Sequence, residues 1–131
     1  MIGLDPNILV RYLAQDDPLQ SAKATDILER RLTRKNPGFV SVVVVVETVR
    51  VLGRSYGQTA QEIAFAVEGL LQVEVLTIEN EQEVFTAMVA LKQGRASFAD
   101  ALIVELGARA GCARTLTFDE KAGRLPGFEL V

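Results

Sequence analysis

Short apolar segments alternate with longer amphipathic segments along this 131-residue chain. The short segments are predicted to be strands, and they lie at residues 1–4, 38–40, 73–77 and 114–118. The longer segments are predicted to be helices, and they lie at residues 6–14, 18–34, 42–54, 59–72, 80–94 and 98–110. Strands that alternate with helices predict a parallel sheet covered on both faces, which is an α/β sandwich.

The run SVVVVVETVR at residues 41 to 50 is the ambiguous part of this pattern. Valine favours strands, so the five valines could extend the strand that precedes them. Ser41 is instead a good N-cap, and apolar residues then recur at helical spacing toward Gly53. We therefore predict a strand at 38–40 and a helix at 42–54. The ionisable Glu47 then directly follows a run of valines that is expected to be buried.

The composition favours a single domain over residues 1–131, since no repeat, low-complexity tract or linker divides the chain. Its longest uninterrupted apolar run is too short to cross a membrane, and its first residues do not resemble an export signal. The single Cys112 cannot form an internal disulfide. These features predict a soluble, cytoplasmic protein.

Absent residue types exclude several kinds of chemistry. The chain has no histidine and one cysteine, which excludes Ser-His-Asp hydrolysis and zinc sites built from His or Cys. Neither a GxGxxG nor a P-loop motif occurs. Any catalysis must therefore use carboxylates, although the net charge of −3 is unlike the basic balance of most nucleic-acid binders.

Four carboxylates from distant parts of the chain are predicted to meet. Ligands of parallel sheets bind beyond the carboxyl ends of the strands. Asp5 and Asp119 each follow a predicted strand, Glu47 lies on the helix after the second strand, and Asp100 lies in the first turn of the last helix. The sequence thus predicts an acidic cluster at one end of the sheet.

Such a cluster must be neutralised, because two carboxylates about 4 Å apart repel by about 4 kcal/mol at an effective dielectric near 20. Protonation, arginines or a hard divalent cation could each supply the compensation, and oxygen-only ligands suit Mg²⁺ or Mn²⁺. Structural alternatives exist for every member. The three aspartates could be helix caps, and Glu47 could pair with Arg50 at i,i+3 spacing. Asp16 and Asp17 are interpreted as turn residues.

Four segments in this order resemble the PIN-domain ribonucleases, and in particular the VapC-type toxins of toxin–antitoxin pairs. The segments are MIGLDPNILVRYL, SVVVVVETVRVL, FADALIVELGARAG and TLTFDEKAGRL, which together extend over almost the whole chain. The resemblance implies a three-layer α/β sandwich around a parallel sheet of about five strands. It also implies Mg²⁺- or Mn²⁺-dependent endonucleolytic cleavage of RNA, an inhibitory antitoxin protein as partner, and a homodimer.

The resemblance assigns the catalytic and metal-binding roles to Asp5, Glu47, Asp100 and Asp119. Asn7 and Thr117 lie where the family often has polar groups near the acids, and these two could orient ligands or water. Arg11 could contact a substrate phosphate or brace its helix.

Two positions depart from the family pattern. Pro6 stands where a threonine is usual, which removes a hydroxyl and a backbone N–H beside Asp5. Ser97 stands where a further acid is often found, three residues before Asp100.

Two hypotheses from other classes stay open beside the nuclease. One is a phosphoacceptor receiver-like domain, which also binds Mg²⁺ through acids but needs an aspartate at the end of a central strand. The other is a non-catalytic interaction module whose acids bind an arginine-bearing partner.

Overall fold

Three short strands form a parallel sheet in the first part of the computed structural model, which describes all 131 residues. They are β1 (Ile2–Gly3), β2 (Gly38–Val40) and β3 (Leu76–Ile78). β2 is central, and it aligns Gly38 with Ile2 on one side and with Leu76 on the other. These strands belong to a compact unit, Met1–Asn80, called here the N-terminal unit.

Gly38 allows the central strand to be covered closely. A Cβ atom at this position would lie 2.8 Å from Leu32 Cδ1, 2.9 Å from Leu4 Cδ1 and 3.1 Å from Leu76 Cδ2. Real Cβ atoms essentially never lie within 3.0 Å of other carbon atoms, so a larger residue would require the ends of the Leu32 and Leu4 side chains to move. Glycine at the start of β2 therefore allows these leucines to pack closely over the strand.

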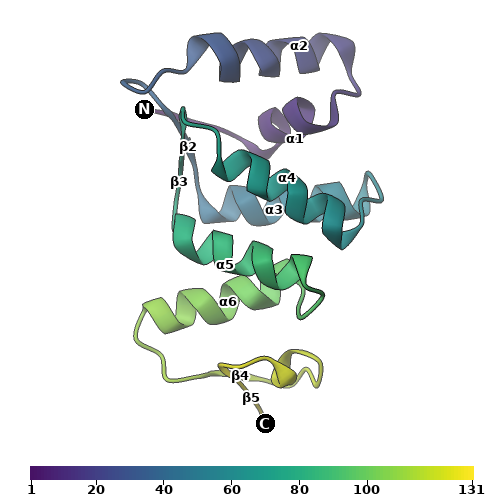
Figure 1. Cartoon of the computed structure of the whole chain (residues 1–131), viewed down its shortest axis with the longest axis vertical. Helices are drawn as coiled ribbons and strands as arrows, with labels where there is room; N and C mark the ends of the chain where they lie inside the picture. The colour runs from purple at the N-terminus through teal and green to yellow at the C-terminus, as the bar shows by residue number, and fades with distance from the viewer. The chain divides into compact units, whose positions relative to one another are not determined.

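Four α-helices lie between the three strands along the chain, two after β1 and two after β2 (Figure 1). They are α1 (Pro6–Ala14), α2 (Pro18–Asp26), α3 (Val42–Arg54) and α4 (Ala60–Leu71). A π-helical turn, η1 (Ile27–Arg31), continues α2. α1 packs against α2 and α3, and α3 packs against α4. α4 begins with the predicted capping box, in which Thr59 and Glu62 each accept a hydrogen bond from the other's backbone N–H.

The valine run forms a helix, as predicted. Ser41 Oγ accepts a hydrogen bond from the Val44 N–H at 3.2 Å, which caps α3. The buried face of α3 consists of Val45, Thr48 and Leu52, which recur at helical spacing. Val45 is 2% exposed whereas Val43 is 76% exposed, so helical periodicity, and not the run of valines as such, decides which residues are buried.

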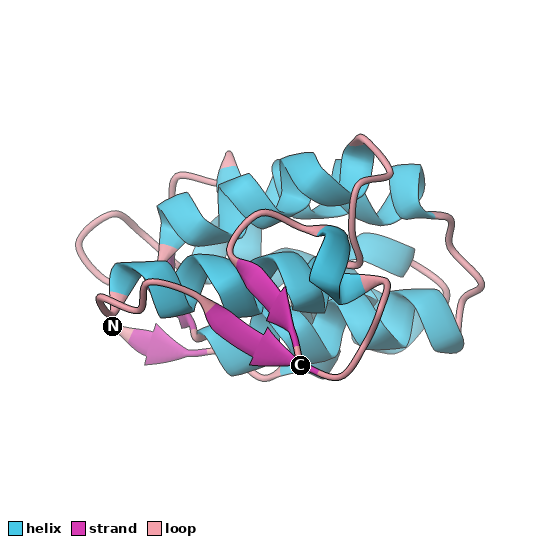
Figure 2. Cartoon of the chain, turned by 90° about the horizontal axis from the view of Figure 1, so that it is seen from below, coloured by secondary structure: helices cyan, strands magenta, loops and turns pink.

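The second compact unit, Glu81–Val131, is called the C-terminal unit. It contains α5 (Glu81–Lys92), α6 (Phe98–Arg109), β4 (Thr115–Thr117), a 3₁₀ turn η2 (Ala122–Arg124) and β5 (Phe128–Leu130). α5 and α6 pack against each other. β4 and β5 pair in parallel, and Figure 2 shows their arrows side by side. Gly111, with φ of 99°, follows α6 as predicted.

The chain has an α/β fold with six α-helices and parallel strand pairing, but the expected single sheet of about five strands is wrong. The strands form a sheet of three and a sheet of two. β4 hydrogen bonds to the β5 segment, for example through Thr115 N–H to the Gly127 carbonyl at 2.7 Å. No local pattern in the sequence predicts β5.

Several predicted boundaries shift. The strand expected at 73–77 lies at Leu76–Ile78, because residues 73 to 76 make turn hydrogen bonds after α4 instead. The helix expected to reach residue 34 ends with η1 at Arg31. Asn80 has φ of 53°, which is not the extended backbone of an N-cap. The prediction of a single domain stays a prediction.

None of the helices is both long and apolar enough to span a membrane.

Candidate active site

Asp5 stands at the start of α1 with a carboxylate that does not cap the helix. Its backbone is extended, with φ of −86° and ψ of 155°, and Pro6 occupies the first helical position as predicted. This backbone is the usual one for an N-cap, yet the Asp5 side chain accepts no capping hydrogen bond. The side chain is exposed. Asp5 is thus the N-cap residue of α1 through its backbone, whereas its carboxylate takes no part in the cap.

Glu47 lies on α3 and is paired with an arginine. Arg50 Nε donates to Glu47 Oε2 at 3.0 Å, and Arg50 Nη2 donates to Glu47 Oε1 at 2.5 Å. These hydrogen bonds hold the pKa of Glu47 below its ordinary value. The expectation that Glu47 is buried is wrong, because its side chain is 39% exposed and lies beside the buried Val45–Thr48–Leu52 face.

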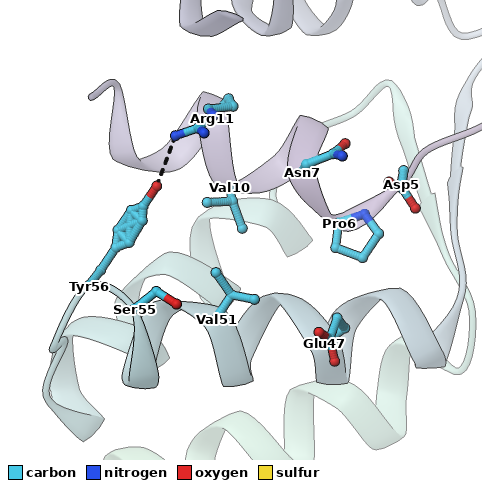
Figure 3. Close-up of a pocket in the computed structure, with 9 residues that line it drawn as sticks. All are labelled: Asp5, Pro6, Asn7, Val10, Arg11, Glu47, Val51, Ser55 and Tyr56. Carbon is cyan, nitrogen blue, oxygen red and sulfur yellow. Dashed lines mark hydrogen bonds between the residues drawn. The ribbon is translucent and has the colours of Figure 1, made fainter. Parts of the chain in front are cut away.

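A cleft of about 490 Å³ between α1 and α3 brings Asp5 and Glu47 together in the N-terminal unit. Figure 3 shows the two helices running in the same direction, with Val10 and Val51 between them. The cleft is lined by Asp5, Pro6, Asn7, Val10, Arg11, Glu47, Val51, Ser55 and Tyr56. In this view Asp5 and Glu47 lie toward one end, and Arg11 and Tyr56 lie at the other.

Asn7 and Arg11 both line this cleft, and their surroundings differ. Asn7 is exposed beside Asp5 at the start of α1. Arg11 is held by three side chains, those of Asp16, Gln20 and Tyr56. The bracing role predicted for Arg11 is therefore present, and its position in the cleft keeps it within reach of a ligand.

Asp100 lies in the first turn of α6 in the C-terminal unit. Its backbone N–H donates to Ser97 Oγ at 3.1 Å, so Ser97 is the N-cap of this helix. The Asp100 side chain is half-buried and makes no part of the cap. The serine found where the family often has an acid thus has a structural role, and Asp100 remains available as a ligand.

Asp119 and Thr117 interact directly after β4. Thr117 Oγ1 accepts a hydrogen bond from the Asp119 backbone N–H at 3.0 Å, and the orienting role expected of Thr117 stays a prediction. Asp119 Oδ1 accepts from the Lys121 N–H at 2.9 Å, and Asp119 is exposed. Asp119 Oδ1 therefore stabilises the turn that leads to η2, which agrees with the capping role offered as the structural alternative for Asp119. Asp119 Oδ2 takes no part in this hydrogen bond.

The four acids thus divide between the units, with Asp5 and Glu47 in the N-terminal unit and Asp100 and Asp119 in the C-terminal unit. Neither unit contains a group of three or more acidic or cysteine side chains placed to hold a metal ion. The convergence of all four acids stays a prediction.

Comparison with protein families matches residues 2–127 to the PIN domain. The chain belongs to the PIN-domain family. The match extends over both units, and PIN domains are in general metal-dependent nucleases. Comparison with curated proteins gave no match.

Two carboxylates of this PIN domain, those of Asp5 and Glu47, could contribute ligands to a divalent cation. Asp5 and Glu47 present carboxylates to one cleft, and Asp5 is not engaged by its own helix. Oxygen ligands of this kind are those that Mg²⁺ and Mn²⁺ prefer. Arg50 occupies both Glu47 oxygens, so a cation that binds Glu47 must displace at least one of these hydrogen bonds.

Tyr56 is a cleft residue that sequence reasoning missed. Its hydroxyl donates to Asp16 Oδ2 at 2.8 Å, 40 positions away in the chain. Asp16 was interpreted as a turn residue, and it also takes part in this side-chain network. No local pattern marks a contact over such a separation.

Proposed function

We propose that this PIN domain is a metal-dependent endoribonuclease and the toxin of a toxin–antitoxin pair. The observation that carries the proposal is the Asp5 carboxylate, which faces the cleft shared with Glu47 and makes no capping hydrogen bond. The order of the four sequence segments supports RNA as the substrate and an antitoxin protein as the partner. Such a pair would act in the cytoplasm.

In this proposal Asp5, Glu47, Asp100 and Asp119 hold Mg²⁺ or Mn²⁺. The cation would supply a Lewis acid that activates water and stabilises the charge that develops on a phosphodiester. Asn7 would orient a ligand beside Asp5. Thr117 would orient Asp119 through the hydrogen bond between its hydroxyl and the Asp119 N–H. Arg50 would release Glu47 to the cation and become free to contact phosphate.

The experiment is cleavage of a labelled RNA by purified protein with Mg²⁺ or Mn²⁺. Asp5→Asn is expected to reduce the cleavage rate at least about 100-fold, because it removes the charge of a direct metal ligand. Asp17→Asn is the matched control, since it makes the same change at the other Asp-Pro helix start, at a residue that does not line the cleft. Cleavage by Asp5→Asn at the rate of the wild type would refute the assignment.

One observation favours the interaction module as a second candidate. The arginine that binds Glu47 shows that this carboxylate can accept a guanidinium group in the geometry expected of an arginine-bearing partner. Calorimetry with Mn²⁺ separates the two functions. The nuclease requires cation binding that Asp5→Asn weakens, whereas the module requires none. The receiver-like hypothesis is not supported, since the central strand β2 is followed by Ser41 and not by an aspartate.

The partner proposals have tests of their own. Expression of the chain alone is expected to arrest growth of a host cell, and expression of Asp5→Asn is not. Co-expression of the protein encoded by the adjacent gene is expected to restore growth. The proposed homodimer is tested by sedimentation of the purified wild type.

A further inference from the structure

The end of the cleft away from the acids contains a fixed arginine. Arg11 Nη1 donates to both oxygens of Asp16, at 3.0 and 3.1 Å, and to Tyr56 Oη at 3.1 Å. Arg11 Nε donates to Gln20 Oε1 at 2.8 Å. These bonds fix the plane of the guanidinium group in the position drawn in Figure 3. A ligand would therefore meet a pre-organised cation there.

Arg11 retains the means to bind an anion. None of these hydrogen bonds uses Nη2, and the side chain is 31% exposed where it lines the cleft. The hydrogen bond from Arg11 to Asp16 raises the arginine's pKa, so the group keeps its charge. Asp16 offsets part of that charge, but a planar guanidinium still offers directed donors to phosphate.

Tyr56 places an aromatic ring beside this cation. It follows the end of α3, and Gly57, with φ of 61°, turns the chain directly after it. The Tyr56 hydroxyl donates to Asp16 and accepts from Arg11, so the ring is tethered through its polar atom. An aromatic ring held at the end of a cleft is the kind of surface on which nucleic-acid bases stack.

Further positive charge lies along the same side of α3. Arg50 and Arg54 follow Glu47 by three and seven positions, so all three lie near one another on the helix surface. Arg54 is near enough to Glu47 to help lower the pKa of that acid. A strand of RNA that entered the cleft would thus pass the acids Asp5 and Glu47 at one end and Arg11 at the other, in spite of the chain's net charge of −3. Arg50 and Arg54 would add positive charge beside Glu47 on the surface of α3.

We propose that Arg11 and Tyr56 form a subsite for one nucleotide that flanks the cleavage point, with Arg11 on its phosphate and the Tyr56 ring against its base. This subsite rests on the proposed ribonuclease function and deepens it. It binds single-stranded RNA, because a base that stacks on Tyr56 must be unpaired and separated from the bases next to it in the strand. Asp16 acts as the positioning residue that holds Arg11 and Tyr56 together.

A purely structural brace is the competing account of the same network. Its hydrogen bonds join α1, the turn before α2 and the residue beyond α3, which would stabilise the N-terminal unit without any ligand. The two accounts differ in what they require of Tyr56. The brace requires its hydroxyl, whereas the subsite requires its ring.

The experiment measures binding of a short single-stranded RNA in an Asp5→Asn background, so that cleavage does not interfere. Tyr56→Leu, which removes the ring, is expected to weaken binding at least about 10-fold. Tyr56→Phe, which keeps the ring, is expected to weaken it less than about 3-fold. Tyr12→Leu is the matched control, since Tyr12 is the other tyrosine of the chain and does not line the cleft.

Arg11 is tested by the salt dependence of the same binding. Arg11→Ala is expected to reduce the slope of log affinity against log salt by about one, because one phosphate contact is lost. Arg30→Ala, at an exposed arginine of η1, is expected to leave the slope unchanged. In the active protein, Tyr56→Leu is expected to raise KM more than it lowers kcat.

Each outcome separates the accounts. Equal losses for Tyr56→Phe and Tyr56→Leu, with a matching loss of thermal stability, would overturn the subsite in favour of the brace. RNA binding unaffected by any of these changes would overturn the subsite and leave the nuclease intact. A wild type that cleaves no RNA and binds none would overturn both. Binding without cleavage, weakened by Tyr56→Leu but not by Tyr56→Phe, would overturn the proposed function and the placement of the subsite beside a cleavage point, and would leave Arg11 and Tyr56 as an RNA-binding site.

Discussion

Two helices of the N-terminal unit begin with the same dipeptide, Asp-Pro, and use it differently. Asp17 Oδ1 accepts hydrogen bonds from the Leu19 and Gln20 N–H groups, at 3.1 and 2.9 Å, and so caps α2. Asp5 caps α1 with its backbone alone. Both residues have extended backbones followed by a proline at the first helical position, although ψ is 155° at Asp5 and 109° at Asp17.

The difference lies in what surrounds each carboxylate. Asp17 has its own helix as partner, whereas Asp5 lines the cleft that it shares with Glu47. An aspartate cap contributes about 1 kcal/mol to helix stability. α1 lacks this contribution although a suitable residue is in place. A residue that departs from its favoured local role is more often part of a functional site than a residue that fulfils it.

The largest effect expected from this comparison is on cleavage by Asp5→Ala. The change removes a proposed metal ligand and no capping bond, so cleavage should fall at least about 100-fold while the free energy of unfolding changes by less than about 0.5 kcal/mol. RNA cleavage and urea denaturation of the same preparation measure the two quantities. A loss of stability as large as that of a removed cap would mean that Asp5 supports its helix after all.

Asp17→Ala should show the opposite pattern. It leaves the Leu19 and Gln20 N–H groups without their side-chain acceptor, so the free energy of unfolding should fall by about 1 kcal/mol. Cleavage should stay within about 3-fold of the wild type at temperatures where the variant is folded. Asp17→Asn is the matched control, because an asparagine side chain can still accept both hydrogen bonds. If Asp17→Ala abolished cleavage while folded, the comparison between the two helix starts would fail.

Caps and periodic patterns were the part of the fold that the sequence predicted well. Ser41 and Thr59 were expected at helix starts and are N-caps in the structure, because capping depends on residues only three positions apart. The same locality explains the helix at Val42–Arg54, where a cap and helical spacing outweigh the β preference of valine.

Features that depend on distant partners were predicted less well. The short strand β5 is defined by its pairing with β4, and no local pattern marks it. Glu47 was expected to be buried because it follows five valines, but the helix turns it away from the buried face and toward Arg50. The Asp16–Tyr56 contact was missed entirely because it joins residues 40 positions apart.

The candidate site shows the same division. Asp5 and Glu47 were both predicted from their places after β1 and β2, and both line one cleft because those strands are neighbours in the sheet. The roles of Asp100 and Asp119 were predicted from their helix and strand ends, and each keeps such a place in the C-terminal unit. The position of Arg11 at the other end of the cleft could not be predicted from the sequence, because it depends on contacts with Asp16 and Tyr56 in the folded chain.

The smallest expected effect concerns the third kind of helix start, the capping box of α4. Glu62 accepts a hydrogen bond from the Thr59 N–H at 3.0 Å, and this bond lowers the pKa of Glu62 below its ordinary value of 4.5. A carboxyl whose folded-state pKa is lowered stabilises the fold above its ordinary pKa, and this stabilisation is lost as pH falls through the folded-state value. Stability should therefore decline on acidification partly through Glu62.

Glu62→Gln tests this directly, because glutamine can still accept the Thr59 hydrogen bond but cannot be protonated in this range. Urea midpoints at neutral pH should be close to those of the wild type, and the decline between about pH 5 and pH 3 should be shallower. Glu29→Gln is the control, at an exposed glutamate outside any capping box. If both variants declined as steeply as the wild type, the Glu62 bond would contribute nothing measurable. The α4 start would then resemble that of α1, where an acid near a helix end does not support the helix.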